Sequence, residues 1–411
     1  MKFPPQRART ATGPRSQPSS SARTDSRHSP REAGIAKVSR PELIQIACNV
    51  ISKADRSHPA DAVLKLELTK HRNIDPGARR WITESVFSYY RWYQWLQRDR
   101  PLSDQLNLAA ELQKRFDREP STFTDSELLQ KAVPNWAAEQ VDVTAEWVRS
   151  LQSRPVLWLR AKAGHEKNVA STLRDCRSLP EIPTALRYDG DEDLFRSPLF
   201  HAGEFELQDL SSQIVGHLCA PAPNETWWDA CAGEGGKLLH LSDLMRNKGL
   251  IWASDRAAWR LQSLKRRAAR AKVFNYRVAP WDGGTKLPTK TKFDGVLVDA
   301  PCSGVGTWQR NPHARWTIRL DDVLELKELQ IRLLIHASAS LKPGGKLIYS
   351  VCTLTQAETT DVAARIQQEL ATFKPLAMRS PLIGVESAQH WIWPQQFGGN
   401  GMFVAAWQRI R

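Results

Sequence analysis

Two cysteines and an aspartate stand where two predicted buried strands end. Asp299 closes the apolar run 293–299 with Cys302 just beyond it, and Cys352 follows the apolar run 347–351. A lone cysteine in a strand is usually a small core residue. An activated, accessible thiol can instead add to an electrophilic carbon and form a covalent intermediate. Two thiols and a carboxylate at strand ends favour a chemical role over packing alone.

A glycine-rich turn joins an earlier strand to a helix. Residues 229–237 read Asp-Ala-Cys-Ala-Gly-Glu-Gly-Gly-Lys. Glycines let a backbone approach a ligand closely, and the amides at a helix N-terminus offer donors. The turn is no phosphate-binding P-loop, because Cys231 replaces a required glycine and Leu238 stands where Ser or Thr is needed.

Asp255 closes the next predicted strand. A carboxylate at this point of an α/β sheet can accept hydrogen bonds from both hydroxyls of a ribose. The alternative is an aspartate that caps the following helix. Beside the glycine-rich turn, the first interpretation gains weight, and together the two motifs indicate a cofactor that carries adenosine.

Alternating strands and helices position these motifs. This alternation predicts an α/β fold with a mainly parallel, doubly wound sheet that is covered on both faces. Ligands bind at the C-terminal strand ends of such sheets. Thr355 and Glu358 have the spacing of a capping box for the last of the helices. The expected strands are 226–231, 249–255, 273–278, 293–299 and 345–351, and the expected helices are 236–247, 256–272, 321–341 and 356–370.

Three segments precede this domain, which spans residues 207–411. Residues 1–35 are rich in Pro, Ser and Arg and are expected to form a disordered basic tail, either solubilising or gripping phosphates. Its prolines argue against a transit peptide, because they break any amphipathic helix. Residues 36–135 have helical periodicity with aromatic residues that we expect in the core, and residues 136–206 indicate a small α+β unit.

Composition points to an intracellular protein with a polyanionic partner. Of 411 residues, 41% are hydrophobic, and no apolar run approaches the roughly 20 residues of a membrane span. Six dispersed cysteines without a CxxC pair fit neither a disulfide scaffold nor a zinc cluster. Half of the net charge of +14 comes from residues 1–40. A second basic run is either a solvated helix or a path for RNA, and it comprises Arg256, Arg260, Lys265, Arg266, Arg267, Arg270, Lys272 and Arg277.

The combined motifs resemble the NOP/SUN-type RNA cytosine-5 methyltransferases, which include the bacterial small-subunit ribosomal RNA methyltransferase B. The family's Asp-x-Cys-Ala-x-Pro-Gly-Gly-Lys, Asp-Ala-Pro-Cys-Ser-Gly and Tyr-Ser-Thr-Cys-Ser motifs correspond to residues 229–237, 299–304 and 349–353. The resemblance covers about residues 154–411. Glu234 replaces the family's proline, and such flanking departures put substrate fit in more doubt than activity.

The resemblance implies a Rossmann-like, S-adenosylmethionine-dependent methyltransferase domain, preceded by an RRM-like α+β subdomain and a helical, NusB-like RNA-binding domain. It implies that Cys352 adds to C6 of cytosine, that Cys302 assists release, and that Asp299 hydrogen-bonds the polar edge of the base. Lys237 completes the implied catalytic set. The implied cofactor contacts are Cys231, Ala232, Gly233, Glu234, Gly235, Gly236, Lys237, Asp255, Arg260, Asp282 and Asp299.

This chemistry needs a thiol because C5 of cytosine is a poor nucleophile until a thiolate has added to C6. The base must also leave any stack to be reached. The expected partner is RNA, with ribosomal RNA favoured and transfer RNA as the alternative, and the expected protein is a cytoplasmic monomer without metal or membrane contact. Near the site we expect Arg310, Arg315 and Arg319, with His313 facing substrate.

Two other functions compete with this one. A non-catalytic RNA-binding factor for ribosome assembly would be expected to have lost a cysteine or the aspartate, whereas Cys302, Cys352 and Asp299 all remain. A methyltransferase for amino groups would need an Asp/Asn-Pro-Pro-Tyr/Phe motif, and residues 299–302 read Asp-Ala-Pro-Cys instead.

Overall fold

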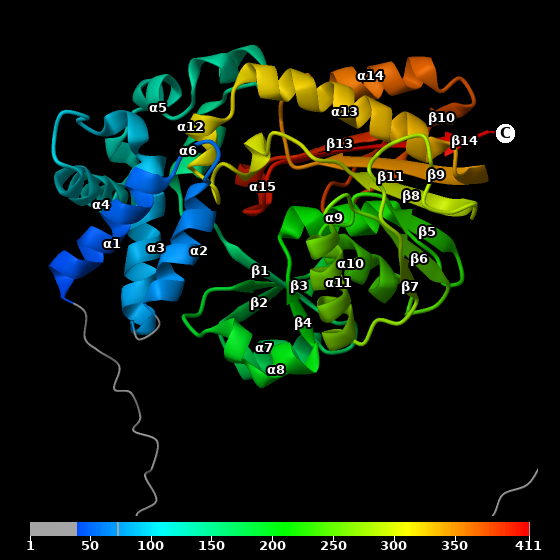
Figure 1. Ribbon diagram of the computed structural model, residues 1–411, viewed down its shortest axis with the longest axis horizontal. Coiled ribbons are helices and arrows are strands. Elements are labelled where there is room, and N and C mark those ends of the chain that lie inside the picture. Colours follow the sequence, from blue (N-terminus) through cyan, green and yellow to red (C-terminus); the bar gives the residue numbers. More distant parts are fainter. Residues whose placement is uncertain (1–38, 72–73, 411) are drawn as a thin grey trace, which may run out of the picture.

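The computed structural model describes residues 39–71 and 74–410, so the expected basic tail, residues 1–35, lies outside the described range. The described chain begins with helices that pack around an aromatic core (Figure 1). Tyr89, Tyr90 and Trp92 are buried, which confirms the expected core role of this region's aromatic residues. The helices are α1 (Arg40–Lys53), α2 (Ala60–Lys70), α3 (Pro76–Arg91), α4 (Leu102–Arg118), α5 (Asp125–Lys131) and α6 (Ala145–Gln152), with the short turns η1 (Tyr93–Trp95), η2 (Pro120–Thr122) and η3 (Asn135–Glu139).

A four-stranded antiparallel sheet follows, in the order β2-β3-β1-β4. It has its own small core, in which Leu159, Leu186 and Phe205 are buried. Its elements are β1 (Leu157–Ala161), α7 (Glu166–Leu173), β2 (Cys176–Leu179), β3 (Ile182–Tyr188), η4 (Leu194–Arg196), α8 (Pro198–Ala202) and β4 (Phe205–Leu207).

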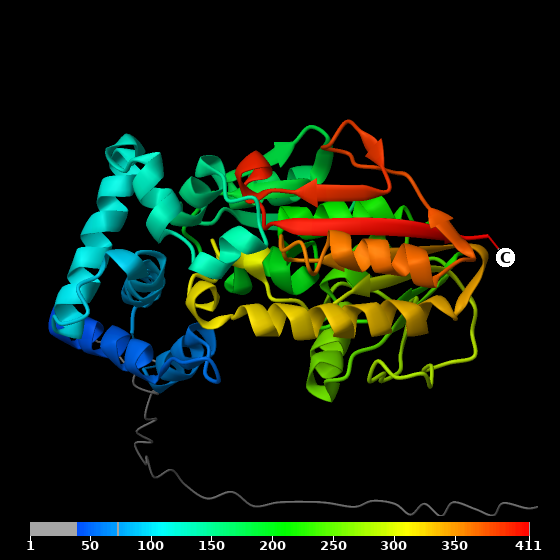
Figure 2. The ribbon, with the colours of Figure 1, turned by 90° about the horizontal axis from the view of Figure 1, so that it is seen from above.

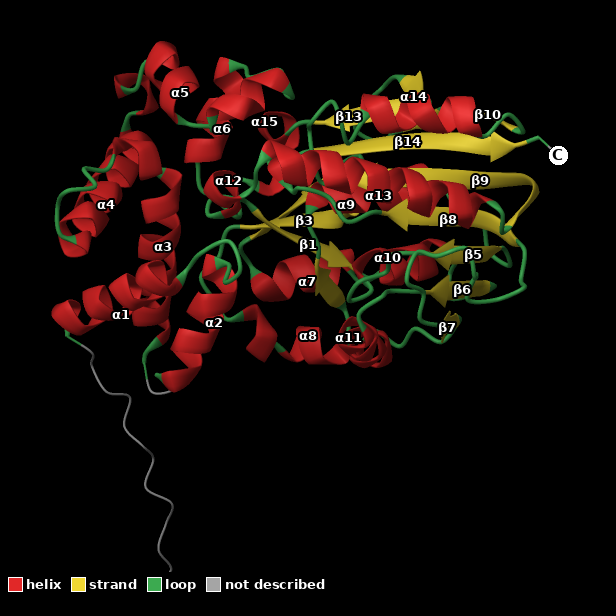
Figure 3. Cartoon of the chain, turned by 45° about the horizontal axis from the view of Figure 1, so that its top comes forward, coloured by secondary structure: helices red, strands yellow, loops and turns green. Residues whose placement is uncertain are grey.

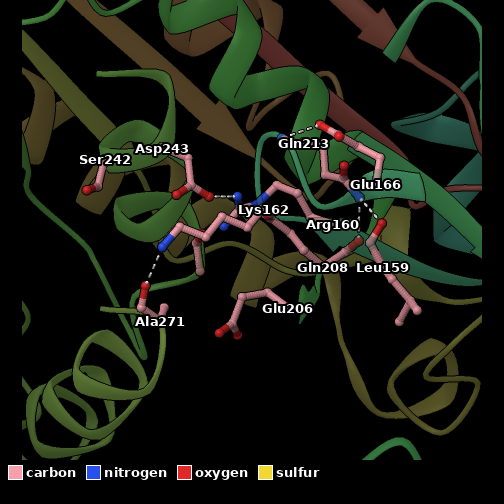
Figure 4. A network of polar contacts seen from close by, with 12 residues as sticks. Leu159, Arg160, Lys162, Glu166, Glu206, Gln208, Gln213, Ser242, Asp243 and Ala271 are labelled. Carbon is pink, nitrogen blue, oxygen red and sulfur yellow. Dashed lines mark hydrogen bonds and ion pairs between the residues drawn. The ribbon is translucent and has the colours of Figure 1, made fainter. Parts of the chain in front are cut away.

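A buried polar network ties this small sheet to the larger domain (Figure 4). Arg160 of β1 is buried, and it donates to Gln208 Oε1 at 2.6 Å and pairs with Asp243. Lys162 donates from Nζ to the carbonyl of Ala271 at 3.3 Å. Because a buried guanidinium needs its acceptors, these contacts fix the placement of β1.

The large sheet has the order β10-β14-β9-β8-β5-β6-β7, with β13 paired to β14. Strands β5 to β9 run parallel, as the alternating pattern predicts, whereas β10, β13 and β14 run antiparallel and were not predicted. The strands are β5 (Thr226–Asp229), β6 (Leu250–Ala253), β7 (Tyr276–Val278), β8 (Phe293–Asp299), β9 (Leu341–Val351), β10 (Phe373–Pro375), β13 (Gln389–Ile392) and β14 (Met402–Arg409), beside the small pair β11 (Met378–Arg379) and β12 (Glu386–Ser387).

Helices cover both faces of this sheet (Figures 1 and 3). Along β8, Leu297 packs toward the α9–α11 face and Val296 and Val298 toward the α13–α14 face, because successive strand side chains alternate between faces. The two cores therefore sandwich the sheet. The helices are α9 (Leu210–Cys219), α10 (Gly236–Leu244), α11 (Ala258–Arg270), α13 (Leu320–Ser338) and α14 (Thr360–Glu369), with shorter turns at η5 (Val305–Thr307), α12 (Ala314–Thr317) and α15 (Pro394–Phe397).

The N-terminal helices pack against the segment that follows β8 (Figure 2). Trp308 is fully buried between Trp136 and Trp147, with ring centroids 5.8 and 6.0 Å away. The expected division into domains stays a prediction, although the helical, small-sheet and large-sheet segments follow one another as expected. In the described part of the chain, no helix is long and apolar enough to cross a membrane.

Two expectations about this segment were wrong. Arg315, expected near the site among other basic residues, is not available to a substrate: it is fully buried and donates to the carbonyls of Ala132, Leu151 and Trp308 at 2.9, 3.0 and 3.3 Å. His313 does not face substrate either, because it is buried with its ring edge-to-face on a tyrosine of α3. Their proximity in sequence to Asp299 could not show that helices 164 to 253 residues earlier in the chain cover them.

Candidate active site

Asp299 is the last residue of β8 and lies at the C-terminal edge of the parallel strands. It pairs in register with Ser350 of β9, whose hydroxyl donates to Asp299 Oδ1 at 2.7 Å. Lys237, in the first turn of α10, donates to Asp299 Oδ2 at 2.7 Å. Burial lowers the pKa of Lys237, but Asp299 and then Cys352 outweigh that effect, so the pKa is raised. The ammonium therefore stays charged beside the aspartate.

The two predicted thiols lie together. Cys302 Sγ and Cys352 Sγ are 3.2 Å apart, and both residues are partly exposed. The hydrogen bond with Cys352, followed by burial and by the charges of Cys352 and then Glu358, raises the pKa of the Cys302 thiol well above its usual value. The remaining cysteines outside the glycine-rich turn, Cys48, Cys176 and Cys219, take no part in this pair. The structure thus brings together the two cysteines that the strand-end rule selected.

The expected capping box at Thr355 and Glu358 was wrong. Helix α14 begins at Thr360, and Glu358 is a fully buried residue of the preceding loop. Thr355 Oγ1 does donate to Glu358 Oε2 at 2.9 Å, but the carboxylate also accepts from the loops that carry both thiols. A spacing rule for helix starts cannot detect such contacts between loops.

The glycine-rich turn is held by Asp255, which lies just beyond the end of β6. Asp255 Oδ2 accepts from the amide of Gly233 at 3.0 Å, and Oδ1 accepts from the amide of Ala257 at 2.8 Å. Asp255 is not the N-cap of the next helix, α11, because that position is Ala257, and its carboxylate instead binds the amides of the glycine-rich turn and of the segment before α11. Each oxygen retains a lone pair for a further donor, such as a hydroxyl.

The turn leaves room for a ligand. A methyl group added at Gly233 or Gly236 would meet no protein atom within 4 Å, whereas one added at Gly235 would lie 2.7 Å from a carbon of Leu264. Asp229, at the end of β5, is fully buried, and neither carboxylate oxygen has a well-formed hydrogen bond. An open cradle beside glycines and an unpartnered buried carboxylate fit a cofactor that carries a positive charge and a ribose.

Burial raises the pKa of Asp229 to about 8, and the like charge of Asp299 adds to this effect. Lys237 and the amide of Cys231 lower the pKa only in part. A carboxyl group of this kind would be stabilised as the anion by a cationic ligand. Asp229 precedes the glycine-rich turn, and it was not among the cofactor contacts expected from the sequence.

The other predicted cofactor residues lie around this turn or outside it. Arg260 is half exposed, with a nitrogen 3.8 Å from Asp255 Oδ2. Asp282 is exposed and accepts from the amide of Gly284 at 2.9 Å. Within residues 39–71 and 74–410, no hydrogen bond or ion pair joins Asp282 to another predicted site residue. The turn itself contributes a half-buried Cys231, a buried Ala232 and an exposed Glu234.

The basic run after Asp255 forms α11 and its flanks. Arg267 and Arg270 both pair with the buried carboxylate of Glu206, so this part of the run joins the small sheet to the large domain. The exposed members include Arg256 and Lys265. RNA contact by part of the run stays a prediction. Among the described residues, no group of three or more His, Cys, Asp or Glu side chains could hold a metal ion.

Comparison with known proteins decides the family. Residues 217–408 match the family of the 16S rRNA methyltransferase RsmB/F. The ribosomal RNA small subunit methyltransferase B of Shewanella oneidensis is 31% identical over 302 residues, which cover 68% of this chain and 68% of that protein. The chain belongs to the RsmB/F family. This membership confirms the predicted resemblance, the Rossmann-like methyltransferase fold and S-adenosylmethionine as the cofactor.

Other RsmB/F relatives match a shorter part. The probable ribosomal RNA small subunit methyltransferase B of Synechocystis is 35% identical over 235 residues, which cover 54% of this chain. The chain spans about half the length of that curated relative, 52%. The crystal structure of PH0851 shares the fold, with a TM-score of 0.72, 22% identity, and coverage of 90% of this chain and 99% of that one.

Proposed function

We propose that this protein transfers a methyl group from S-adenosylmethionine to C5 of a cytosine in RNA, most naturally ribosomal RNA, through a covalent adduct. The observation that carries the proposal is the thiol pair, Cys302 and Cys352, 3.2 Å apart beyond two neighbouring parallel strands. A methyltransferase acting on a nucleophilic nitrogen or oxygen needs no thiol. Carbon 5 of cytosine does, because it becomes nucleophilic only after a thiolate has added to C6.

The residues divide this chemistry between them. The Gly233–Gly236 turn, Asp229 and Asp255 would hold the cofactor, which supplies the methyl group when it is bound. Cys352 adds to C6, and the C5 proton must leave before the bond from C6 to sulfur can break. Cys302 lies close enough to Cys352 Sγ to assist that release.

Asp299 and Lys237 prepare the base. The Lys237 ammonium and the Ser350 hydroxyl hold both oxygens of Asp299, so the carboxylate is fixed in orientation. A fixed, charged group can hydrogen-bond the polar edge of a cytosine and stabilise charge that develops on the ring. Removal of this group would therefore impair chemistry more than overall folding.

Trapping of the adduct tests the proposal. We expect Cys302→Ala to add to RNA and accept the methyl group but to stall before release, because addition and elimination need different groups. The variant should retain RNA in a denaturant-resistant band that requires S-adenosylmethionine. Cys352→Ala should form no band and no 5-methylcytosine. Gel electrophoresis with labelled 16S rRNA and nucleoside mass spectrometry provide both readouts.

Two outcomes would contradict this assignment. If the thiols were only packing residues, both variants would be mildly destabilised and neither would form an adduct. If the band appeared with Cys352→Ala instead, the two thiols would have exchanged roles. Cys48→Ala is a suitable control, because this free thiol lies in α1 and takes no part in the thiol pair, so the variant should leave adduct and product unchanged.

A further inference from the structure

Glu358 is a fully buried carboxylate that accepts five hydrogen bonds. Its Oε1 accepts from the amide of Ser303 at 2.8 Å and from Gln330 Nε2 at 3.0 Å. Its Oε2 accepts from the hydroxyls of Ser303, of Thr353 at 3.0 Å and of Thr355 at 2.9 Å. Within the part of the chain that the structure describes, no cationic side chain pairs with it. Hydrogen bonds alone therefore offset the cost of burying this charge.

These donors flank both thiols. Ser303 follows Cys302, and Thr353 follows Cys352, so one carboxylate joins the two loops directly. Gln330 also donates to the carbonyl of Pro301 at 2.8 Å, on the other side of Cys302. A buried polar network around Glu358 thus lies beneath the site and holds the two thiol loops at a fixed distance from each other.

The polar network around Glu358 extends into the sheet through a buried tyrosine. Tyr349 of β9 donates from its hydroxyl to the carbonyl of Glu358 at 2.6 Å and lies 2.9 Å from Gln330 Oε1. Buried networks of this kind are rigid only when their members are satisfied. Because Tyr349 and Gln330 belong to β9 and α13, the loops are fixed to the scaffold and not only to each other.

The charges around the two thiols are unequal. The negative charge of Glu358 contributes to the raised pKa of Cys302, after the hydrogen bond with Cys352, burial and the charge of Cys352. On the other side, the positive charge of Lys237 interacts with Cys352 and with Asp299. Burial, followed by the charges of Glu358 and Cys302, raises the pKa of Tyr349 well above its usual value, so Tyr349 stays neutral. The negative charge of Glu358 therefore disfavours a thiolate at Cys302.

We propose that Glu358 is a positioning residue that fixes both thiol loops and keeps the proton shared by the two sulfurs on Cys302, so that Cys352 is the thiolate. When the pair loses one proton to solvent, the remaining proton stays bonded to Cys302 Sγ. The Cys302 thiol then donates a hydrogen bond to the thiolate of Cys352. The roles of nucleophile and helper rest on the proposed function. The order of ionisation rests only on the structure and can be measured without RNA.

The test is thiol alkylation in the folded protein across a range of pH. Iodoacetamide modification of Cys302 and Cys352 is followed separately by peptide mass spectrometry in wild type and in Glu358→Gln. In wild type, Cys352 should become reactive at lower pH than Cys302. In Glu358→Gln, which keeps the size of the side chain but removes its charge, the Cys302 profile should move down by about one pH unit, because one neighbouring charge commonly shifts a pKa by that amount.

Two control variants separate the effect of the Glu358 charge from the effect of the hydrogen bonds that Glu358 accepts. Thr355→Val removes one hydrogen bond but keeps the carboxylate, so it should lower the melting temperature and leave the Cys302 profile in place. Glu67→Gln neutralises another buried glutamate, which lies in α2 and pairs with Lys53 and Lys70, and it should move neither profile.

The proposal is overturned if Glu358→Gln leaves the Cys302 profile unchanged. It is also overturned if Cys302 becomes reactive at lower pH than Cys352 in wild type, a result that does not depend on any variant folding. Neither measurement needs cofactor or RNA. A correct order of ionisation without an RNA adduct would therefore reject the proposed function and leave the role of Glu358 intact.

Discussion

At the scale of single residues, Gly236 tests where the cofactor lies. It begins α10, and an added methyl group would meet no protein atom within 4 Å. Gly236→Ala should therefore leave the melting temperature unchanged or slightly raised, because alanine is the better helix former. It should weaken S-adenosylmethionine binding at least tenfold by filling the cradle. Calorimetric titration gives the affinity, and an unchanged value would place the cofactor elsewhere. Gly384→Ala, also in open space, is the control.

Asp229 gives a prediction about pH. Its pKa is raised to about 8 in the folded chain, from about 4 in the unfolded chain, so the folded state binds an extra proton between these values. The free energy of unfolding should therefore fall as pH rises through this window, by up to about 1.4 kcal/mol per pH unit. Asp229→Asn should remove that slope and be more stable than wild type at pH 8. Urea denaturation gives the free energy of unfolding at each pH. If this free energy depended on pH in the same way in wild type and in Asp229→Asn, the prediction would be contradicted.

Sequence alone predicted most residues of the candidate site but not the residues that hold them in place. Asp299, Cys302 and Cys352 could be placed together because parallel strands end at one edge of a sheet. Glu358 could not, since its partners come from the two thiol loops and from α13, and a local spacing suggested a cap instead. The sequence showed Asp229 only as the first residue of the 229–237 motif. The structure was needed to show that its carboxylate is buried without a well-formed hydrogen bond.

At the scale of elements, the parallel strands were predictable and the antiparallel ones were not. Strands β5 to β9 alternate with long periodic helices, which is a strong pattern. Strand β14 (Met402–Arg409) is a continuous buried run between β9 and β10, and β10 has three residues ending in proline. Neither segment alternates buried and exposed residues, so their pairing depends on tertiary context.

Gly306 shows how closely two loops approach beside the thiols. Its amide donates to the carbonyl of Cys352 at 3.1 Å, and its carbonyl accepts from the amide of Gly401 at 2.7 Å. A methyl group added at Gly306 would lie 2.0 Å from the Gly401 carbonyl oxygen. The loops must separate to admit it, and a backbone atom cannot move aside as a flexible side chain can.

Gly306→Ala should therefore destabilise the fold by about 1–3 kcal/mol, the usual cost of overpacking. It should also reduce adduct formation more than stability alone explains, because the displaced loop carries the Cys352 carbonyl contact. Urea denaturation and adduct yield at a temperature where the variant is fully folded measure the two effects. Full adduct yield in the destabilised variant would show that this contact does not position the thiol.

At the scale of the whole molecule, the N-terminal helices are attached directly to the segment that follows the Cys302 loop. Trp308 and Arg315 both lie in the stretch that leads from the Cys302 loop to α13, and both are buried against N-terminal helices. Trp316 Nε1 also donates to the carbonyl of Tyr90 at 2.6 Å. The position of the Cys302 loop therefore depends on helices that contribute no predicted site residue.

Arg315 is the centre of this attachment. It donates to the carbonyl of Ala132, which ends α5, and to that of Leu151 in the last turn of α6. Helix ends leave carbonyls without partners, and a cation there is favourable. The buried guanidinium of Arg315 thus donates to terminal carbonyls of two N-terminal helices, whereas the backbone of Arg315 belongs to the methyltransferase domain.

Arg315→Leu should separate the two units. The substitution leaves up to three buried carbonyls without donors, each at a cost of about 1–3 kcal/mol, and fills the space with a side chain that cannot replace them. We expect differential scanning calorimetry to show a lower melting temperature and two transitions where wild type has one, because the helical unit loses its main polar attachment. Arg319→Leu, at an exposed arginine of the same segment, should keep the wild-type profile. A single transition at the wild-type temperature for Arg315→Leu would mean that packing around Trp308 alone joins the units.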